Sequence, residues 1–315
     1  MWTHFKVNVN NCQKRQQVSH RLCQYTHHDG EYIGGPENIH MPSFDSAGLA
    51  RELIKIENNP DEEAKGHKLT NRMKWVQEQL SRRGLLHYDS DDMRVMDFRA
   101  FKTIVPFIDD FSKPAICYVA DTSQFKKGSE VCSERPSSVV MALALAEQLK
   151  RTDKYRNVII LFINQHSILN AACKIKEMAE RGIFQVRIGD FVVLDNFFGD
   201  QVYMEEEYST TAGKTLQGLL NHAGIQIEAY DYDFESLATF LSNEEYSAIK
   251  VGSMIDREEY DRLDKLEQES IVGAEQQIKT CSTQLYKATY RVLWQHALTM
   301  SAMYYQWGMN TDYKH

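Results

Sequence analysis

The segment "NVIILFINQHSILNAA", residues 157–172, decides the fold because it joins a buried strand to a polar turn and a helix. Residues 158–162 are all apolar, as in strands of a sheet that is covered on both faces. Asn164, Gln165, His166 and Ser167 follow, and a helical pattern then resumes. In open α/β sheets, ligands bind beyond the carboxyl ends of the strands. The segment therefore predicts a strand whose polar end lies at a binding or catalytic site.

Strand-like and helix-like segments alternate on both sides of this stretch. The continuous apolar run 115–120 predicts another buried strand, and the nearly all-apolar segment 137–150 predicts a buried helix. The other expected strands are 93–98, 103–108, 191–194 and 225–230, and the other expected helices are 46–56, 62–83, 167–181, 210–222, 234–242 and 269–306. This alternation predicts an α/β fold: a three-layer α/β/α arrangement with a central mixed, mostly parallel sheet.

The two ends of this pattern define the expected domains. Residues 1–45 are polar and contain several glycines and prolines, so they are expected to be an N-terminal extension that is mostly loop. Residues 46–315 are expected to form a single α/β domain. The acidic stretch 204–211 is expected to be a solvated loop.

Composition excludes several classes of function. The chain has 315 residues and a net charge of −8, with no block of lysines and arginines, so nucleic-acid binding is not expected. No run approaches the roughly 20 apolar residues that span a bilayer, so membrane insertion is not expected. The N-terminus has no apolar signal region, which favours a soluble protein that is cytoplasmic or exported without a cleaved signal peptide.

Other motifs are weak or absent. The six cysteines form no CxxC pair, which disfavours a zinc ribbon or a thioredoxin-like site. The sequence "AGKT" (212–215) ends like a phosphate-binding loop, but Tyr208 stands where its first glycine belongs. No G-x-G-x-x-G or G-x-S-x-G occurs, which disfavours dinucleotide binding and a serine hydrolase.

Polar residues follow three expected strands and precede the buried helix. Asp121 follows strand 115–120, Gln165 and His166 follow strand 157–163, Asp195 follows strand 191–194, and Glu134 stands before helix 137–150. If the sheet order brings these strand ends together, one imidazole, one amide and three carboxylates converge at one edge.

The order of these segments resembles the zinc aminopeptidases and glutaminyl cyclases, which share the co-catalytic zinc exopeptidase fold. The resemblance covers about residues 46–306. It rests on five segments in the family's order: "YVADTS" (118–123), "CSERPSSVVMALALAEQL" (132–149), "LFINQHSILNAA" (161–172), "VVLDNFFGD" (192–200) and "DREEYDRLDKLEQESI" (256–271). The resemblance implies the same three-layer fold.

Three positions depart from the family in ways that remove its chemistry. Val119 stands where the resemblance implies a metal-binding histidine, and Arg257 stands at the last such histidine. A valine has no lone pair for zinc, and a guanidinium repels it. Gln165 stands at the position of the general-base glutamate, and an amide cannot take a proton from a metal-bound water. A two-zinc peptidase needs both parts, so ordinary aminopeptidase activity is not expected.

Four positions keep groups that can bind a cation or support a ligand. Asp195 matches a metal-binding aspartate of the family, and Asp121 matches its supporting aspartate. Glu134 replaces the bridging aspartate, and His166 replaces a metal-binding glutamate. Glu134, His166 and Asp195 are acceptable ligands for one zinc ion.

Two interpretations therefore stay open. In the first, the protein is a catalytically inactive aminopeptidase-like module that binds a protein or peptide and needs no cofactor, as transferrin receptor and nicastrin retain this fold without hydrolysis. Arg257 would then pair with Glu134 or Asp195 in place of the lost cations. In the second, one altered zinc site supports a hydrolase or cyclase that acts on peptide or aminoacyl-type amide bonds.

Overall fold

The computed structural model describes the chain from residue 46 onward, with gaps. The described residues are 46–56, 70–85, 87–90, 93–97, 114–122, 136–151, 157–164, 168–184, 187–195, 202–205, 211–222, 227–230, 236–253, 292–301 and 303–304. Residues 1–45 and the expected strand 103–108 lie outside them, so the domain boundary at residue 45 stays a prediction.

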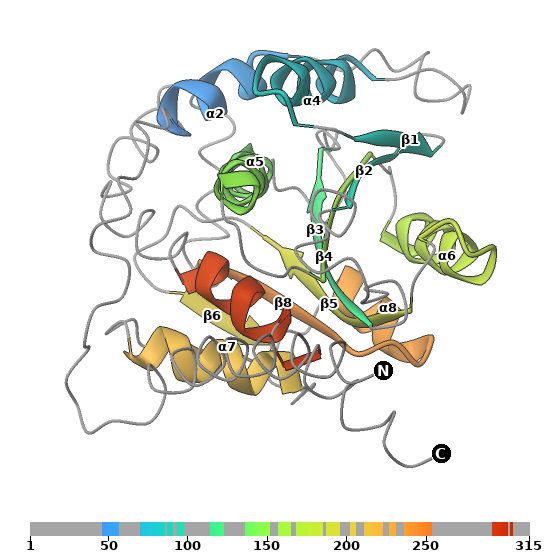
Figure 1. Ribbon diagram of the computed structural model, residues 1–315, viewed down its shortest axis with the longest axis vertical. Helices are drawn as coiled ribbons and strands as arrows, with labels where there is room; N and C mark the ends of the chain where they lie inside the picture. The colour runs from blue at the N-terminus through green and yellow to red at the C-terminus, as the bar shows by residue number, and fades with distance from the viewer. Residues whose placement is uncertain are drawn as a thin grey trace, which may run out of the picture. The chain divides into compact units, whose positions relative to one another are not determined.

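One eight-stranded sheet organises the described chain, with the order β1-β2-β4-β3-β5-β8-β6-β7 (Figure 1). Four of its seven strand pairs are parallel: β3–β4, β3–β5, β5–β8 and β6–β7. The strands are β1 (Tyr88–Ser90), β2 (Met93–Asp97), β3 (Ala115–Asp121), β4 (Val158–Ile163), β5 (Ile188–Leu194), β6 (Val202–Glu205), β7 (Ile227–Tyr230) and β8 (Ala248–Ser253). The predicted mixed, mostly parallel sheet is confirmed.

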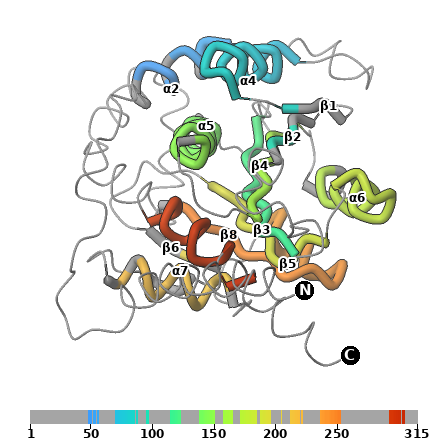
Figure 2. The backbone as a smooth tube through the Cα atoms, viewed as in Figure 1, coloured from blue at the N-terminus to red at the C-terminus, as the bar shows by residue number. Residues whose placement is uncertain are grey.

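Helices cover both faces of this sheet, which accounts for the apolar strands at its centre (Figure 2). The helices are α2 (Ser46–Ile54), α4 (Asn71–Arg82), α5 (Pro136–Arg151), α6 (Ile168–Glu180), α7 (Thr211–His222) and α8 (Leu237–Asn243). Residues 292–301 are also helical and are called the C-terminal segment below. The predicted three-layer α/β/α fold is thus confirmed.

The first face of the sheet packs against α6 and α8. Alternate residues of the central strands point to this face because successive side chains of a strand alternate. Val119, Leu161 and Val193 stand in register across β3, β4 and β5 and are almost fully buried. They form one apolar cluster with Ile175 of α6 and Leu241 of α8. This cluster lies directly beneath the carboxyl ends of the strands.

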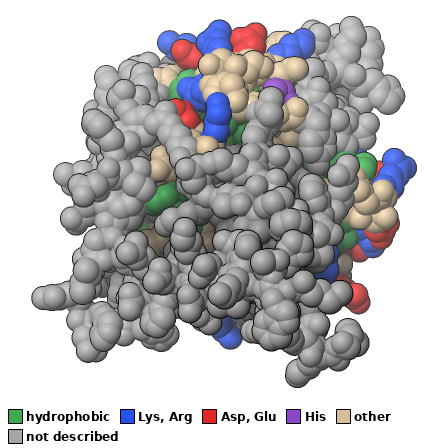
Figure 3. Space-filling view, in the orientation of Figure 1, with side chains coloured by type: hydrophobic (Ala, Val, Ile, Leu, Met, Phe, Trp, Pro, Cys, Tyr) green, Lys and Arg blue, Asp and Glu red, His purple; other side chains and the backbone are tan. Residues whose placement is uncertain are grey.

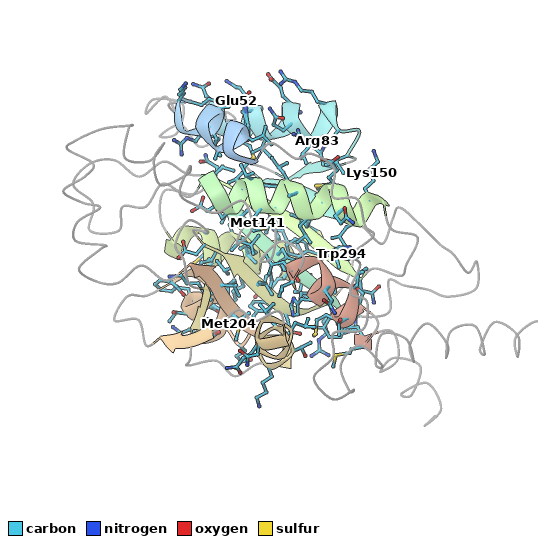
Figure 4. All side chains as sticks on the ribbon, turned by 90° about the vertical axis from the view of Figure 1, so that its left-hand side faces the viewer. Glu52, Arg83, Met141, Lys150, Met204 and Trp294 are labelled. Carbon is cyan, nitrogen blue, oxygen red and sulfur yellow. The ribbon has the colours of Figure 1, made fainter. Side chains whose placement is uncertain are left out.

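The opposite face packs against α5 and the C-terminal segment. Helix α5 is apolar almost all round, and its residues 139–143 are fully buried. Such a helix must lie between other elements, and α5 contacts both α2 and the central strands. Figure 4 shows Met141 on α5 and Trp294 on the C-terminal segment, the two elements that cover this face.

Helix α4 is shorter than the predicted helix 62–83. It begins at Asn71, because Thr70 is extended and its side chain accepts a hydrogen bond from the Met73 N–H. It ends as predicted at Gly84, whose φ of +58° suits a residue without a Cβ. The Leu85 N–H bonds to the Leu80 carbonyl across this turn, which is the Schellman arrangement.

One expectation, about a loop, was wrong, and the strands β1, β6 and β8 were not predicted. Residues 202–205 form β6, and Met204 is buried, so the expected solvated loop cannot begin at residue 204. Strand β8 was not predicted, although it lies inside the sheet between β5 and β6. Its sequence "AIKVGS" interrupts a short apolar run with a lysine and a glycine, which hides the strand pattern.

Buried hydrogen bonds attach the C-terminal segment to the sheet. The Tyr118 hydroxyl of β3 lies 2.5 Å from His296 Nδ1, and His296 Nε2 lies 3.2 Å from the Ala212 carbonyl oxygen of α7. A carbonyl oxygen only accepts, so Nε2 donates to it and Nδ1 accepts from Tyr118. Burial lowers the pKa of His296 to about 3, so the ring is neutral near pH 7.

A buried carboxyl group binds Tyr304, which lies just beyond the C-terminal segment. Asp190 of β5 accepts hydrogen bonds from the hydroxyls of Tyr304 and Ser247. Burial raises the pKa of Asp190, although the Ser247 hydrogen bond opposes this shift. Gly189 makes room for the tyrosine, because a Cβ there would lie 2.8 Å from the Tyr304 hydroxyl oxygen.

The outer surface of the described helices is charged with both signs. Figure 3 shows basic and acidic side chains over α4 and α6 on one face of the molecule. Lys176 of α6 and Glu244 form an exposed ion pair. Within the described chain, no helix combines the length and the apolar character that a membrane crossing needs.

Candidate functional site

The candidate site is the edge formed by the carboxyl ends of β3, β4, β5 and β8, called the carboxyl edge below. These four strands are neighbours and parallel, so their ends lie in one row. Ala120 is in register with Phe162 of β4 and Leu194 of β5, and Leu194 is in register with Val251 of β8. The sheet order therefore places Asp121 and Asp195 at the same edge, which meets the condition that the sequence analysis set for these two residues.

Asp195 is the best defined polar residue of this edge. Its backbone N–H donates to the Val251 carbonyl oxygen at 2.8 Å, which fixes it beside β8. Only 6% of Asp195 is exposed, and its Oδ2 lies 3.0 Å from Nζ of Lys250. Lys250 is in register with Val193, two residues before Asp195, so both charged side chains point to the α6 and α8 face.

This ion pair places a positive charge directly on the carboxylate. The two side chains are 9% and 8% exposed, so water screens them little. Burying either charge alone is costly, whereas together they form a charge-assisted hydrogen bond. The arrangement therefore neutralises Asp195 from within the protein chain.

The two other described candidates differ from each other in burial. Val119 is 1% exposed and belongs to the apolar cluster beneath the carboxyl edge. Asp121 is the last residue of β3 and is half-buried. Asp121 thus stays at the edge, whereas Val119 contributes apolar contacts to the core.

Two further polar residues lie at the edge beside Asp121. Thr122 donates from both its backbone N–H and its hydroxyl to the Ile163 carbonyl oxygen at 2.8 Å, which fastens the end of β3 to β4. Asn164 follows β4 and is 7% exposed, and its Oδ1 has no hydrogen-bond donor among the residues that the structure describes. The amide oxygen of Asn164 is therefore a buried acceptor at this edge.

Four candidates from the sequence lie outside the described residues: Glu134, Gln165, His166 and Arg257. Their roles stay predictions. The expected pairing of Arg257 with Glu134 or Asp195 also stays a prediction. In the structure, Asp195 pairs with another cation, Lys250.

The described residues of the edge do not fit a zinc centre. Within the described ranges, no group of three or more histidine, cysteine, aspartate or glutamate side chains is arranged to hold a metal ion. Val119 offers no ligand atom, and the protonated amine of Lys250 beside Asp195 repels a metal cation. Two of the three candidate zinc ligands, Glu134 and His166, lie outside the described residues, and the third, Asp195, is paired with Lys250.

Sequence reasoning missed Lys250, although the sequence holds a signal for it. Lys250 follows Ala248 and Ile249 and precedes Val251, so it is a lysine inside an apolar run. Lysine is almost never fully buried without a partner. Once 248–251 is assigned as a strand, its lysine requires a carboxylate on a neighbouring strand, and β5 offers Asp195.

Comparisons with known proteins agree on the fold. No family model matches the chain, and no curated protein matches its sequence. Among solved structures, the LapA aminopeptidase of Legionella pneumophila aligns with a TM-score of 0.54 and 11% identity over 88% of this chain and 78% of that chain. The glutaminyl cyclase of Fimbriiglobus ruber aligns with a TM-score of 0.51 and 13% identity over 81% and 94%.

A Bacteroides thetaiotaomicron glutaminyl cyclase bound to N-acetylhistamine gives a similar result, with a TM-score of 0.51 and 12% identity over 82% of this chain and 98% of that chain. Identities this low establish architecture and leave the chemistry to the site. The chain therefore has the fold of the zinc aminopeptidases and glutaminyl cyclases.

Proposed function

We propose that the protein is a catalytically inactive aminopeptidase-like module that binds a protein or peptide. The Lys250–Asp195 ion pair carries this proposal. Asp195 follows β5 at the carboxyl edge, where the resemblance places a metal-binding aspartate, and an ammonium group lies 3.0 Å from its carboxylate. A carboxylate that is already neutralised has little attraction for zinc, and the neighbouring charge opposes it.

The state of Val119 supports the same proposal. The resemblance assigns this position to a metal-binding histidine, and here the side chain packs among Leu161 and Val193. The cluster gains apolar burial at the point where catalysis would need a polar ligand. Two positions of the metal site have thus taken roles in packing and charge balance.

Binding is the function that this arrangement still allows. The carboxyl edge of a parallel sheet is a general location for ligand sites, and the edge keeps the half-buried Asp121. Its carboxylate oxygens suit the N–H groups of a peptide. The proposal therefore places recognition of a protein or peptide at the carboxyl edge.

Metal content and turnover test this proposal together. Purified protein is analysed for zinc by mass spectrometry and is assayed with aminoacyl fluorogenic substrates and with peptides that begin with glutamine. We expect less than about 0.1 zinc per chain, and no turnover after zinc is added. An active aminopeptidase assayed in parallel controls for the substrates.

The opposite result has a clear signature. About one zinc per chain, with turnover that His166→Ala abolishes, would replace the proposal with the altered single-zinc hydrolase or cyclase. Binding itself is tested by isothermal titration with any protein captured from a lysate. Asp121→Ala is expected to weaken that binding at least tenfold without lowering the unfolding midpoint by more than about 3 °C.

A further inference from the structure

Lys250 is a charged residue in an apolar strand, and its position calls for an explanation. It stands between Ile249 and Val251, both of which are almost fully buried, and only 7% of Lys250 itself is exposed. An ammonium group in such surroundings loses most of its hydration, which a buried partner must offset. The partner is Asp195, whose Oδ2 lies 3.0 Å from Nζ.

The backbone fixes both members of the pair. Lys250 belongs to β8 and is in register with Val193 of β5, and the Asp195 N–H bonds to the Val251 carbonyl oxygen. The two residues are therefore held by adjacent strands rather than by loops. Adjacent strands therefore hold the two Cα positions close together, and the low exposure of both side chains favours their contact over hydration of either charge.

We propose that Lys250 is the resident cation of the carboxyl edge: its ammonium group takes the electrostatic role that a metal ion would have at Asp195, which makes this position independent of metal. A protonated amine neutralises the carboxylate but has no lone pair for a ligand and no site that activates water. The inference deepens the proposed function, because it rests on the loss of catalysis and names what replaces the metal.

A double-mutant cycle tests this inference. Lys250→Met keeps the length of the side chain and removes its charge, and Asp195→Asn removes the opposite charge. Each single variant leaves a buried charge without its partner and is expected to lower the unfolding midpoint by roughly 5–15 °C. The double variant leaves neither charge and is expected to recover at least half of the summed loss.

Two controls separate charge from packing. Lys250→Arg keeps the charge, and we expect it to lose less than half of what Lys250→Met loses. Lys176→Met removes the cation of the exposed Lys176–Glu244 pair, whose side chains are 39% and 38% exposed. Exposed pairs contribute little to stability, so we expect a shift of less than about 2 °C.

The midpoint is also measured with zinc chloride and with EDTA. We expect neither to shift the wild-type protein by more than about 1 °C. Additive effects in the cycle, or zinc that stabilises the wild type and fails to stabilise Asp195→Asn, would overturn the inference. The double-mutant cycle reports folding, and the zinc and EDTA measurements report metal binding. If the stability losses of the two single variants add and the protein shows no turnover, only the inference about Lys250 is rejected. Turnover together with intact coupling between Lys250 and Asp195 rejects only the proposed loss of catalysis.

Discussion

Tyr118 and His296 are 178 positions apart in the chain and share a buried hydrogen bond of 2.5 Å. The bond joins the centre of the sheet to the C-terminal segment, and His296 continues it to the Ala212 carbonyl oxygen at the start of α7. Three elements that are distant in sequence thus meet at one imidazole ring. The pKa of that ring makes the attachment sensitive to acid.

Acid is expected to weaken the fold through His296. Burial lowers its folded pKa to about 3 from 6.5, so the unfolded chain binds this proton first. Stability is therefore full above about pH 6.5 and falls as the pH drops toward 3. The slope attributable to this group is up to about 1.4 kcal/mol per pH unit.

His296→Gln, which keeps an acceptor and a donor, is expected to lose this slope in urea titrations at pH 4 to 8. The stability difference between the variant and the wild type at pH 8 measures the packing cost of the substitution. If the pH dependence of stability in the variant still matched that of the wild type, the assignment of this slope to His296 would be contradicted.

Removal of the tyrosine hydroxyl is expected to be costly. Tyr118→Phe keeps the ring but leaves the buried Nδ1 of His296 without this donor, so the free energy of unfolding should fall by about 1–3 kcal/mol. Chemical denaturation measures the loss. In combination with His296→Leu, which has no acceptor for the Tyr118 hydroxyl, the two losses should not add, since both variants remove the same hydrogen bond. Fully additive losses would show that the two side chains act separately.

The cost of Asp190→Asn is expected to depend on pH. Burial raises the folded pKa of Asp190 above 3.8, so its contribution to stability is full below that value and is lost as the pH rises through the folded pKa. Asparagine keeps the size and an oxygen that accepts from Tyr304 or Ser247. The variant should therefore be less destabilising at pH 7 than at pH 3.5, as measured by denaturant titration at both values. The reverse order would contradict the raised pKa.

Two glycines are expected to respond oppositely to alanine. Gly84 ends α4 with a φ of +58°, and a Cβ there would meet Lys150 Nζ at 3.1 Å. The Lys150 amine donates hydrogen bonds to the carbonyl oxygens of Arg83 and Gly84. Figure 4 labels Arg83 and Lys150. Gly84→Ala should therefore cost about 1–2 kcal/mol.

Gly218 is the matched control for Gly84. It lies on the exposed side of α7, and a Cβ there would meet nothing within 4 Å. Alanine at this position should stabilise the protein by about 0.5–1 kcal/mol, because glycine is a poor helix former. Thermal unfolding of both variants measures the difference, and equal shifts would contradict the assigned end of α4.

The central part of the fold could be predicted because its elements are apolar on every side. Strands β3 and β4 and helix α5 appear in the sequence as continuous apolar runs, and burial confirms each one. Strand β8 could not be found in this way, because Lys250 and Gly252 interrupt its run. The prediction of a buried strand depends on a continuous apolar run, and the buried charge of Lys250 interrupts that run. The charge is explained by its partner Asp195, which follows β5.

The same limit applies to the candidate site. The positions of Asp121 and Asp195 at strand ends were predicted, because both residues directly follow apolar runs. One interpretation expected Arg257 to pair with Glu134 or Asp195. The structure pairs Asp195 with Lys250, which the sequence separates from it by 54 intervening residues. Sequence spacing identifies groups on one element, but contacts between elements depend on strand order.

The order of the sheet also bears on how the chain is made. Strands β6 and β7 leave the ribosome before β8, yet among the described strands β8 is the one that connects them to β5. Until residue 253 has been synthesised, one side of β5 and one side of β6 carry unsatisfied backbone groups. A nascent chain of this protein therefore passes through a stage in which β5 and β6 each have an unpaired edge, because β8 pairs with both and is synthesised last. We expect chaperones to bind the nascent chain at that stage.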